Sequence, residues 1–245
     1  MMTIAEFSLW WILILTVLAY LNYYYPQYSK FTAYGLFRES MTKMDKPPKV
    51  ILLGDSILNN SRYVPLGKSV GASLQDIYGS GLKIYAQDGA LIQNVYNQVE
   101  QYSSYNDASG EASHDNTHIV ISVGGNDMLN AMNLQALSDE KIDKFASQYE
   151  RLVKHVCSTF PGSRIYLLNV YQPTEERYQK ISKYIDRWNY SVESLVENGD
   201  MKRVTIVDVV SIVSDEEDFI SEVEPSIKGG KKIAKAIVEK INEFL

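Results

Sequence analysis

The sequence predicts an α/β fold: a three-layer flavodoxin-like sandwich around a five-stranded parallel sheet, with an additional N-terminal transmembrane helix. Two observations predict the sandwich. Short apolar runs recur from residue 49 onward, and the segments between them are long enough for the helical crossovers that parallel strands require. A third observation, an uncharged apolar stretch at residues 7–25, predicts the additional helix.

The apolar stretch at residues 7–25 has the length of a membrane span. As a helix it would extend about 28 Å, close to the thickness of a bilayer core. Trp10 and Trp11 near one end and the tyrosines 23–25 at the other suit the two membrane interfaces, and Pro26 would end the helix. A signal peptide or a docked amphipathic helix is the alternative, but no basic region precedes the stretch and no clear cleavage site follows it. We therefore expect residues 1–26 to be a membrane anchor.

The charges after this stretch predict which side of the membrane the rest of the chain occupies. Basic residues cluster just beyond the span, at Lys30, Arg38, Lys43, Lys46 and Lys49. The positive-inside tendency then keeps the soluble part on the cytoplasmic side of a single-pass membrane protein. A single cysteine, Cys157, excludes an internal disulfide and agrees weakly with that side. Residues 27–48 are expected to be a juxtamembrane connector, and residues 49–245 the folded domain.

The folded domain alternates apolar runs with segments of helical period. The strand candidates are Val50–Leu53, Lys83–Ala86, His118–Val123, Arg164–Asn169 and Val204–Val207. Long helices are predicted at Ser138–Cys157, Thr174–Val196 and Gly229–Leu245, the first of them behind a Ser-Asp-Glu capping signal. The polar stretch Ser103–Asn116 is predicted to be a surface loop. A net charge of −6 without a basic block argues against a nucleic-acid partner.

Three of the predicted strands end in residues suited to chemistry. The first runs into Gly54-Asp55-Ser56-Ile57, the second ends at Asp88-Gly89, and the third runs into Gly124-Gly125-Asn126-Asp127. Each segment taken singly is compatible with an ordinary turn or helix cap. Parallel strands, however, present their carboxyl ends at one edge of the sheet, where α/β folds place their binding sites. The three segments together therefore predict one site.

These motifs, in this order, resemble those of the SGNH or GDSL-type hydrolase superfamily over about residues 49–245. The resemblance implies that Ser56 is a nucleophile that attacks an ester or acyl carbonyl. It also implies an oxyanion hole formed by backbone N–H groups at Ser56 and Gly89 and by the side-chain amide of Asn126. Preorganised neutral donors of this kind stabilise the negative charge that develops on the carbonyl oxygen. The resemblance implies no required cofactor.

The C-terminal motif departs from the family pattern. Where the family has Asp-x-x-His, this chain has Ser221 in place of the Asp and Glu224 in place of the His. Glu224 is then the candidate base, provided that burial or like charge raises its pKa from about 4.3. Asp55, Asp88 and Asp127 are the candidate sources of that charge. The histidines, His114, His118 and His155, are expected at the opposite edge of the sheet or on helix ends.

Several functions remain open at this point. The first is a membrane-anchored ester or acyl hydrolase that acts on a small-molecule, lipid or glycan ester. The alternative is a catalytically inactive relative that binds an acylated or glycan ligand. A hard-metal site built from the acidic residues and a scaffold that works through the N-terminal helix are weaker alternatives. The sequence does not select the substrate or the oligomeric state.

Overall fold

The five predicted strands form one parallel sheet. The computed structural model describes residues 48–109, 116–198 and 201–245. The strand order is β2-β1-β3-β4-β5, and every pairing is parallel. The strands are β1 Lys49–Gly54, β2 Leu82–Ile84, β3 Thr117–Ser122, β4 Arg164–Leu168 and β5 Val204–Val207. The α/β class, the strand set and the parallel sheet predicted from the sequence are confirmed.

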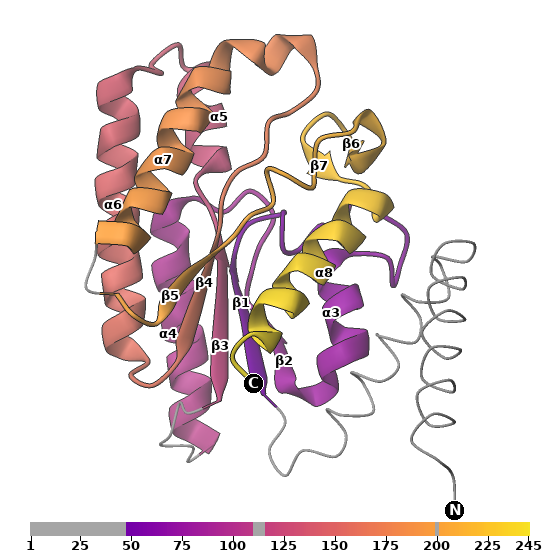
Figure 1. The fold of residues 1–245 in the computed structure, drawn as a ribbon, viewed down its shortest axis with the longest axis vertical. Helices are drawn as coiled ribbons and strands as arrows, with labels where there is room; N and C mark the ends of the chain where they lie inside the picture. Colours follow the sequence, from indigo (N-terminus) through magenta and orange to yellow (C-terminus); the bar gives the residue numbers. More distant parts are fainter. Residues whose placement is uncertain (1–47, 110–115, 199–200) are drawn as a thin grey trace, which may run out of the picture. The chain divides into compact units, whose positions relative to one another are not determined.

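Helices cover both faces of this sheet, which gives the three layers of a flavodoxin-like fold. Figure 1 shows α4, α6 and α7 on one face and α3 and α8 on the other. The helices are α3 Val70–Tyr78, α4 Ile92–Ser109, α5 Gly125–Asn133, α6 Asp139–Thr159, α7 Ser182–Asn198 and α8 Ile227–Asn242, with short 3₁₀ turns η1 Gly79–Gly81, η2 Glu176–Ile181 and η3 Glu216–Asp218. A small antiparallel hairpin, β6 Phe219–Ile220 and β7 Glu224–Pro225, precedes α8.

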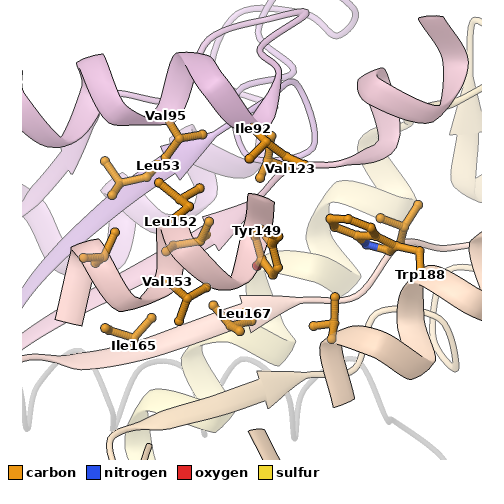
Figure 2. Packing of buried hydrophobic residues seen from close by; sticks show 14 of the residues in the cluster. Leu53, Ile92, Val95, Val123, Tyr149, Leu152, Val153, Ile165, Leu167 and Trp188 are labelled. Carbon is orange, nitrogen blue, oxygen red and sulfur yellow. The ribbon is translucent and has the colours of Figure 1, made fainter. Parts of the chain in front are cut away.

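The core lies between the sheet and the helices. Strand β3 is buried along its whole length, and β1 is buried after its first residue, as expected for parallel strands covered on both faces. Figure 2 shows Leu53 and Leu167 of the sheet packed with Leu152 of α6. The same cluster extends to α7, where the Trp188 indole packs against the Tyr149 ring with 5.1 Å between ring centroids. The large aromatic side chains of α6 and α7 thus fill the space beside the site described below.

Two predicted segment types were wrong. Residues 103–109 of the predicted loop are helical, because α4 continues to Ser109. Tyr102 is buried there against Phe160, with 5.0 Å between ring centroids, and this packing outweighs the polar sequence around it. The predicted helix Thr174–Val196 begins instead as η2 and becomes α-helical only at Ser182. Tyr178 and Ile181 are both buried, and a 3₁₀ turn places residues three apart on one face.

No described helix is both long and apolar enough to cross a bilayer. The predicted span at residues 7–25 lies outside the described residues, as does most of the predicted connector. The membrane anchor and the domain boundaries therefore stay predictions.

The glycine that precedes α5 as its N-cap is required by its surroundings, which a substitution would test. Gly124 has a φ of 112°, and a Cβ there would overlap the Trp188 indole. Gly67 also has a positive φ, 76°, but nothing lies within 4 Å of a Cβ at that position. We expect Gly67→Ala to lower the free energy of unfolding by about 1 kcal/mol through backbone strain alone. Gly124→Ala should lower it by about 2–4 kcal/mol, because overpacking adds to strain. Urea unfolding measures both, and equal losses would contradict the packing argument.

Candidate active site

Ser56 lies in a tight turn directly after β1. Gly54 has a φ of 125°, and a Cβ there would overlap the Ser122 carbonyl oxygen on β3. The Asp55 N–H donates to that carbonyl over 2.9 Å. The Gln98 amide of α4 both accepts from the Gly54 N–H, at 2.6 Å, and donates to the Gly54 carbonyl, at 2.9 Å. These bonds fix the backbone that carries Ser56 at the carboxyl edge of the sheet.

The Asp55 side chain stabilises the same turn from inside. Its Oδ1 accepts from the Ile57 N–H at 3.1 Å and from the Ser122 hydroxyl at 3.0 Å. Burial raises the pKa of Asp55 to about 7, although both hydrogen bonds act in the other direction. Asp55 therefore shapes the turn, and the contact with the serine hydroxyl comes from another residue.

That residue is Glu224, from β7 of the hairpin. The Ser56 hydroxyl donates to Glu224 Oε1 over 2.9 Å, and both side chains are buried. Burial raises the pKa of Glu224 to about 7, with a smaller contribution from the Asp88 charge, while the hydrogen bond from Ser56 lowers it. The second oxygen, Oε2, is buried and has no hydrogen-bond partner among the described residues. A carboxyl group in this environment changes its charge near neutral pH.

The main chain on either side of Glu224 is tied to the sheet. The Tyr171 hydroxyl, in the loop after β4, donates to the Val223 carbonyl at 2.7 Å. The Asn60 amide, in the loop after Ser56, donates to the Pro225 carbonyl at 2.9 Å. Asn60 Oδ1 also accepts from the Val70 N–H at the start of α3, at 2.9 Å. Sequence reasoning missed both residues, because a single Tyr or Asn in a loop carries no pattern that reveals such a role.

The turn of the hairpin holds an unusual backbone conformation. Ser221 and Glu222 have φ values of 48° and 76°, in the left-handed region that non-glycine residues seldom adopt. The Glu222 carboxylate accepts from the Tyr178 hydroxyl at 2.9 Å and forms an ion pair with Arg177. These contacts hold the turn against η2. Ser221 thus occupies a strained turn position.

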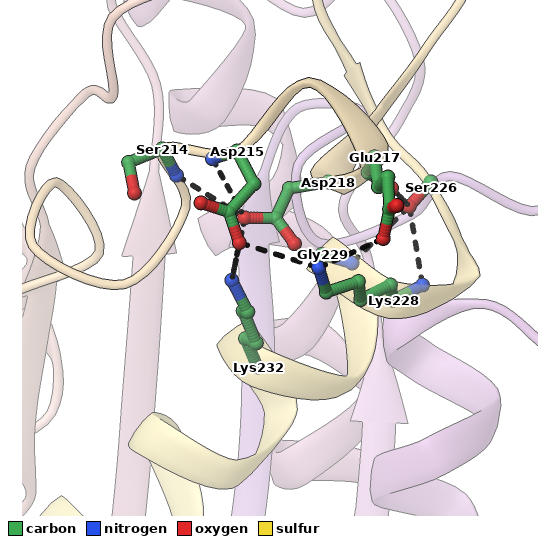
Figure 3. A network of polar contacts seen from close by, with 8 residues as sticks. All are labelled: Ser214, Asp215, Glu217, Asp218, Ser226, Lys228, Gly229 and Lys232. Atoms are coloured by element: carbon green, nitrogen blue, oxygen red, sulfur yellow. Dashed lines mark hydrogen bonds and ion pairs between the residues drawn. The ribbon is translucent and has the colours of Figure 1, made fainter.

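A second set of polar contacts anchors the hairpin on its other side, at the start of α8 (Figure 3). Ser226 is the N-cap of α8, and its hydroxyl accepts from the N–H groups of Lys228 and Gly229. Its own N–H donates to the Asp218 carbonyl at 2.8 Å. The Asp218 carboxylate is fully buried and pairs with Lys232 at 2.6 Å. The segment that carries Glu224 is therefore fixed two residues before and two residues after that side chain.

Asn126 lines the same pocket as Ser56, whereas Gly89 does not. Asn126 lies in the first turn of α5, and its side-chain amide donates to the Ala90 carbonyl at 3.2 Å. Ser56, Asn126 and Glu224 all line one pocket, whereas Gly89 does not line it. Gly89 has a φ of 74° in the turn that Asn126 contacts through Ala90. The predicted donors Ser56 and Asn126 thus line the same pocket. Gly89 lies outside its lining, next to the Ala90 carbonyl that Asn126 contacts.

The two other acidic residues singled out from the sequence have structural contacts. Asp127 Oδ2 accepts from the Ile92 N–H at the start of α4, at 3.1 Å, and burial raises its pKa to about 6. Asp88 accepts from the Tyr63 hydroxyl at 2.9 Å and lies 3.4 Å from Arg62. Among the described residues, no group of three or more His, Cys, Asp or Glu side chains is arranged to hold a metal ion.

The pocket encloses about 460 Å³ of empty space, its mouth included. It lies at the carboxyl edge of the sheet, between the Ser56 turn, α5, the start of α7 and the hairpin. This position is typical of sites for small ligands in α/β folds.

The family model of GDSL-like lipases and acylhydrolases matches residues 50–237. The chain belongs to this family. It is therefore a hydrolase of the GDSL type, and the resemblance inferred from its motifs is confirmed. The search among functionally curated proteins returned no match.

Solved structures support the fold. A lipolytic protein of the G-D-S-L family from Veillonella parvula is 17% identical, with a TM-score of 0.60, over 78% of this chain and 96% of that one. A variant of the acetyl-xylooligosaccharide esterase Axe2 from Geobacillus stearothermophilus is 19% identical, with a TM-score of 0.59, over 81% and 96%. A GDSL-like lipase from Parabacteroides merdae is 16% identical, with a TM-score of 0.59, over 82% and 98%.

The two histidines in the described part of the chain, His118 and His155, do not line the pocket that contains Ser56. His118 pairs with Val50 near the start of β1, about 20 Å along the strand direction from the serine. It is buried and forms a 2.8 Å hydrogen bond with the Tyr166 hydroxyl. His155 packs against Tyr96 on the helical layer, with 5.2 Å between ring centroids. His114 lies outside the described residues.

The buried carboxyl groups predict how stability depends on pH. Asp55, Asp127 and Glu224 have folded-state pKa values of about 7, 6 and 7, all raised by burial from about 4. Through these three groups the folded protein binds more protons than the unfolded chain between pH 4 and 7, so their contribution to stability falls as pH rises through this window and levels off above it. Burial lowers the pKa of His118 to about 4, which acts in the opposite direction, but it is one group against three. We expect the melting temperature to be higher at pH 5 than at pH 8. Glu224→Gln should make this decline shallower, and an unchanged or reversed slope would contradict the assignment.

Proposed function

We propose that this protein is a serine ester hydrolase in which Ser56 is the nucleophile and Glu224 the general base. One observation carries the proposal: the 2.9 Å hydrogen bond from the Ser56 hydroxyl to a buried glutamate whose pKa is about 7. A base with a pKa near the working pH combines a large deprotonated fraction with adequate basicity. A glutamate in water has a pKa of about 4.3. Glu224 meets the requirement because burial raises its pKa to about 7.

The reaction would proceed through an acyl-enzyme. Ser56 Oγ attacks the ester carbonyl carbon while its proton moves to Glu224. As the tetrahedral intermediate collapses, the carbon–oxygen bond to the alcohol breaks and Glu224 returns the proton to the leaving alcohol. A water molecule then attacks the acyl carbon and gives a proton to Glu224, which transfers it to Ser56 as the acid is released. The glutamate ends each cycle ionised.

The developing oxyanion would be held by the Ser56 backbone N–H and the Asn126 amide, with Gly89 as the third donor by family analogy. Asn126 lines the pocket beside Ser56, and its amide has one N–H bonded to Ala90. The amide carries a second N–H that is able to face the substrate. A neutral donor suits this site, because a cation there would lower the pKa of the adjacent carboxyl groups.

The membrane part of the proposal rests on the sequence. Residues 7–25 would anchor the protein, and the basic residues that follow favour a hydrolase domain on the cytoplasmic side. An anchored hydrolase has ready access to lipid or membrane-linked esters. A catalytically inactive binding protein remains the alternative outcome of the labelling experiment below.

Labelling of the full-length protein with a fluorophosphonate tests the serine and its base together. We expect a Ser56 adduct by intact mass, a rate that rises tenfold per pH unit below about pH 7 and is flat above it, and slowing of about 100-fold or more in Glu224→Gln. The rise follows because only ionised Glu224 accepts the proton. A folded protein that forms no adduct, or a Glu224→Gln variant that keeps the wild-type rate, would reject the mechanism.

Matched variants make the labelling interpretable. Ser56→Ala should form no adduct at any pH. Ser147→Ala and Glu239→Gln make the same chemical changes on exposed faces of α6 and α8, and both should label at the wild-type rate.

Tyr171 is expected to act as a positioning residue, through the Val223 carbonyl next to Glu224. Tyr171→Phe removes the hydroxyl that donates to that carbonyl and keeps the ring. We expect kcat for a soluble ester to fall about tenfold with little change in KM, because a small displacement of the base slows proton transfer. Tyr166→Phe removes an equally buried hydroxyl at the opposite edge of the sheet, bonded to His118. It should cost similar stability, about 1 kcal/mol, and leave kcat unchanged, so equal kcat losses would indicate a general structural effect.

A further inference from the structure

The loop before the hairpin contains a fully buried carboxylate. Asp218, the last residue of η3, is 0% exposed. Its Oδ2 accepts from the N–H groups of Ser214 and Asp215, at 3.2 and 3.1 Å, and from the Lys232 ammonium at 2.6 Å. Its Oδ1 is buried and has no hydrogen-bond partner among the described residues. A carboxylate in this environment needs a cation close by, because desolvation penalises its charge.

Lys232 supplies that cation. It lies one helical turn after Lys228 on the same face of α8, and both lysines pair with Asp215 (Figure 3). They differ in their other partner: Lys228 reaches Glu217, whose side chain is exposed, whereas Lys232 reaches the buried Asp218. An exposed ion pair contributes little to stability, but loss of one partner from a buried pair leaves an uncompensated charge. The two lysines are therefore not equivalent.

Asp218 is joined to Glu224 through the backbone of the hairpin. Strand β6 begins at the next residue, and its Ile220 pairs with Glu224 across the hairpin. The Asp218 carbonyl accepts from the Ser226 N–H at 2.8 Å, two residues after Glu224. A Cβ at Gly229 would overlap this same carbonyl, so the first turn of α8 lies directly against the Asp218 main chain. A displacement of Asp218 would therefore move Glu224 as well.

From these contacts we infer that Lys232 is a positioning residue of the active site: by pairing with the buried Asp218 at the foot of the hairpin, it keeps Glu224 in hydrogen-bonding contact with Ser56. Lys232 does not line the Ser56 pocket, so it acts through the hairpin and not on the substrate. The inference rests on the proposed function, since it takes Ser56 as the nucleophile and Glu224 as its base.

Substitution of Lys232 in the full-length protein tests this role. Lys232→Met removes the ammonium group and keeps most of the aliphatic stem. With p-nitrophenyl acetate as substrate, we expect kcat to fall about 10- to 100-fold and KM to change less than about threefold, because a small displacement of a reacting group has effects of this size. Lys228→Met makes the same change one turn earlier and should keep the wild-type kcat. A folded Lys232→Met protein with the wild-type kcat would overturn the inference.

The pH profile of fluorophosphonate labelling distinguishes positioning from a direct effect of charge. Burial is the main cause of the raised pKa of Glu224, so a displaced and hydrated glutamate in Lys232→Met should lower the midpoint of the profile by about one pH unit. Loss of the Lys232 charge alone would raise the midpoint, because a nearby cation lowers the pKa of a carboxyl group. The ionisable groups that interact with Glu224 stay unchanged in this variant: Asp55, Asp88, Tyr63 and Tyr171. An unchanged or higher midpoint would reject positioning through the hairpin.

Two further variants separate positioning from a general loss of stability. Adding Asp218→Asn to Lys232→Met removes the buried charge, while the amide oxygen is still able to accept from the two loop N–H groups. This double variant should regain a kcat and a midpoint close to the wild-type values, even if Lys232→Met alone does not fold. Ile241→Ala removes a buried side chain from the far end of α8 and should lower the melting temperature without changing kcat. Absence of rescue, or an equal loss of kcat in Ile241→Ala, would indicate a general structural effect and reject the assignment.

The results also separate this inference from the proposed function. If the wild-type protein hydrolyses no ester and Ser56 forms no fluorophosphonate adduct, the proposed function fails and this inference fails with it. If hydrolysis depends on Ser56 and Glu224 but not on Lys232, only the positioning role fails.

Discussion

The arrangement of this site depends on one hydrogen bond between residues 168 positions apart, from the Ser56 hydroxyl to the Glu224 carboxyl. A carboxyl group in water is too acidic to hold a proton near neutrality. Burial supplies the necessary change in basicity, but a buried ionisable group is costly unless the surrounding structure holds it in place. The parallel sheet presents Ser56 at its carboxyl edge, and the hairpin before α8 brings the glutamate over that edge. Neither element would form a site without the other.

The way the glutamate is held differs from the way a histidine base is held. A catalytic imidazole is oriented by a carboxylate on its second ring nitrogen, and this chain has Ser221 where the resemblance would place that acid. A carboxylate base has no second nitrogen to orient, and here Oε2 has no partner among the described residues. Orientation comes instead from the backbone: Tyr171 and Asn60 bind the carbonyls on either side of Glu224. A glutamate in this position therefore needs no orienting acid at Ser221.

The sequence was sufficient for the sheet and for the three residues that the structure brings together in one pocket, because both leave strong local patterns. Fully apolar runs such as Ile51–Leu53 identify buried parallel strands, and Ser56, Asn126 and Glu224 stand at recognisable motif positions. The extension of α4 past residue 103 depended on Tyr102 packing against Phe160, a contact between segments far apart in the chain. The 3₁₀ start of the segment before α7 depended on burial of Tyr178 and Ile181. Tyr171 and Asn60 were unpredictable for the same reason, since a side chain that binds a distant carbonyl needs no local pattern.

The remaining acidic residues explain why we propose Glu224, and not a neighbour, as the base. Asp55 has a similarly raised pKa, but its Oδ1 already accepts two hydrogen bonds that shape the serine turn. Asp127 is turned toward the start of α4. Asp88 lies close enough to raise the pKa of Glu224, yet its oxygens are bonded to Tyr63 and Arg62. A raised pKa alone therefore does not identify the base. Only the carboxyl group that also contacts the serine hydroxyl can take its proton, and in the described structure that group belongs to Glu224.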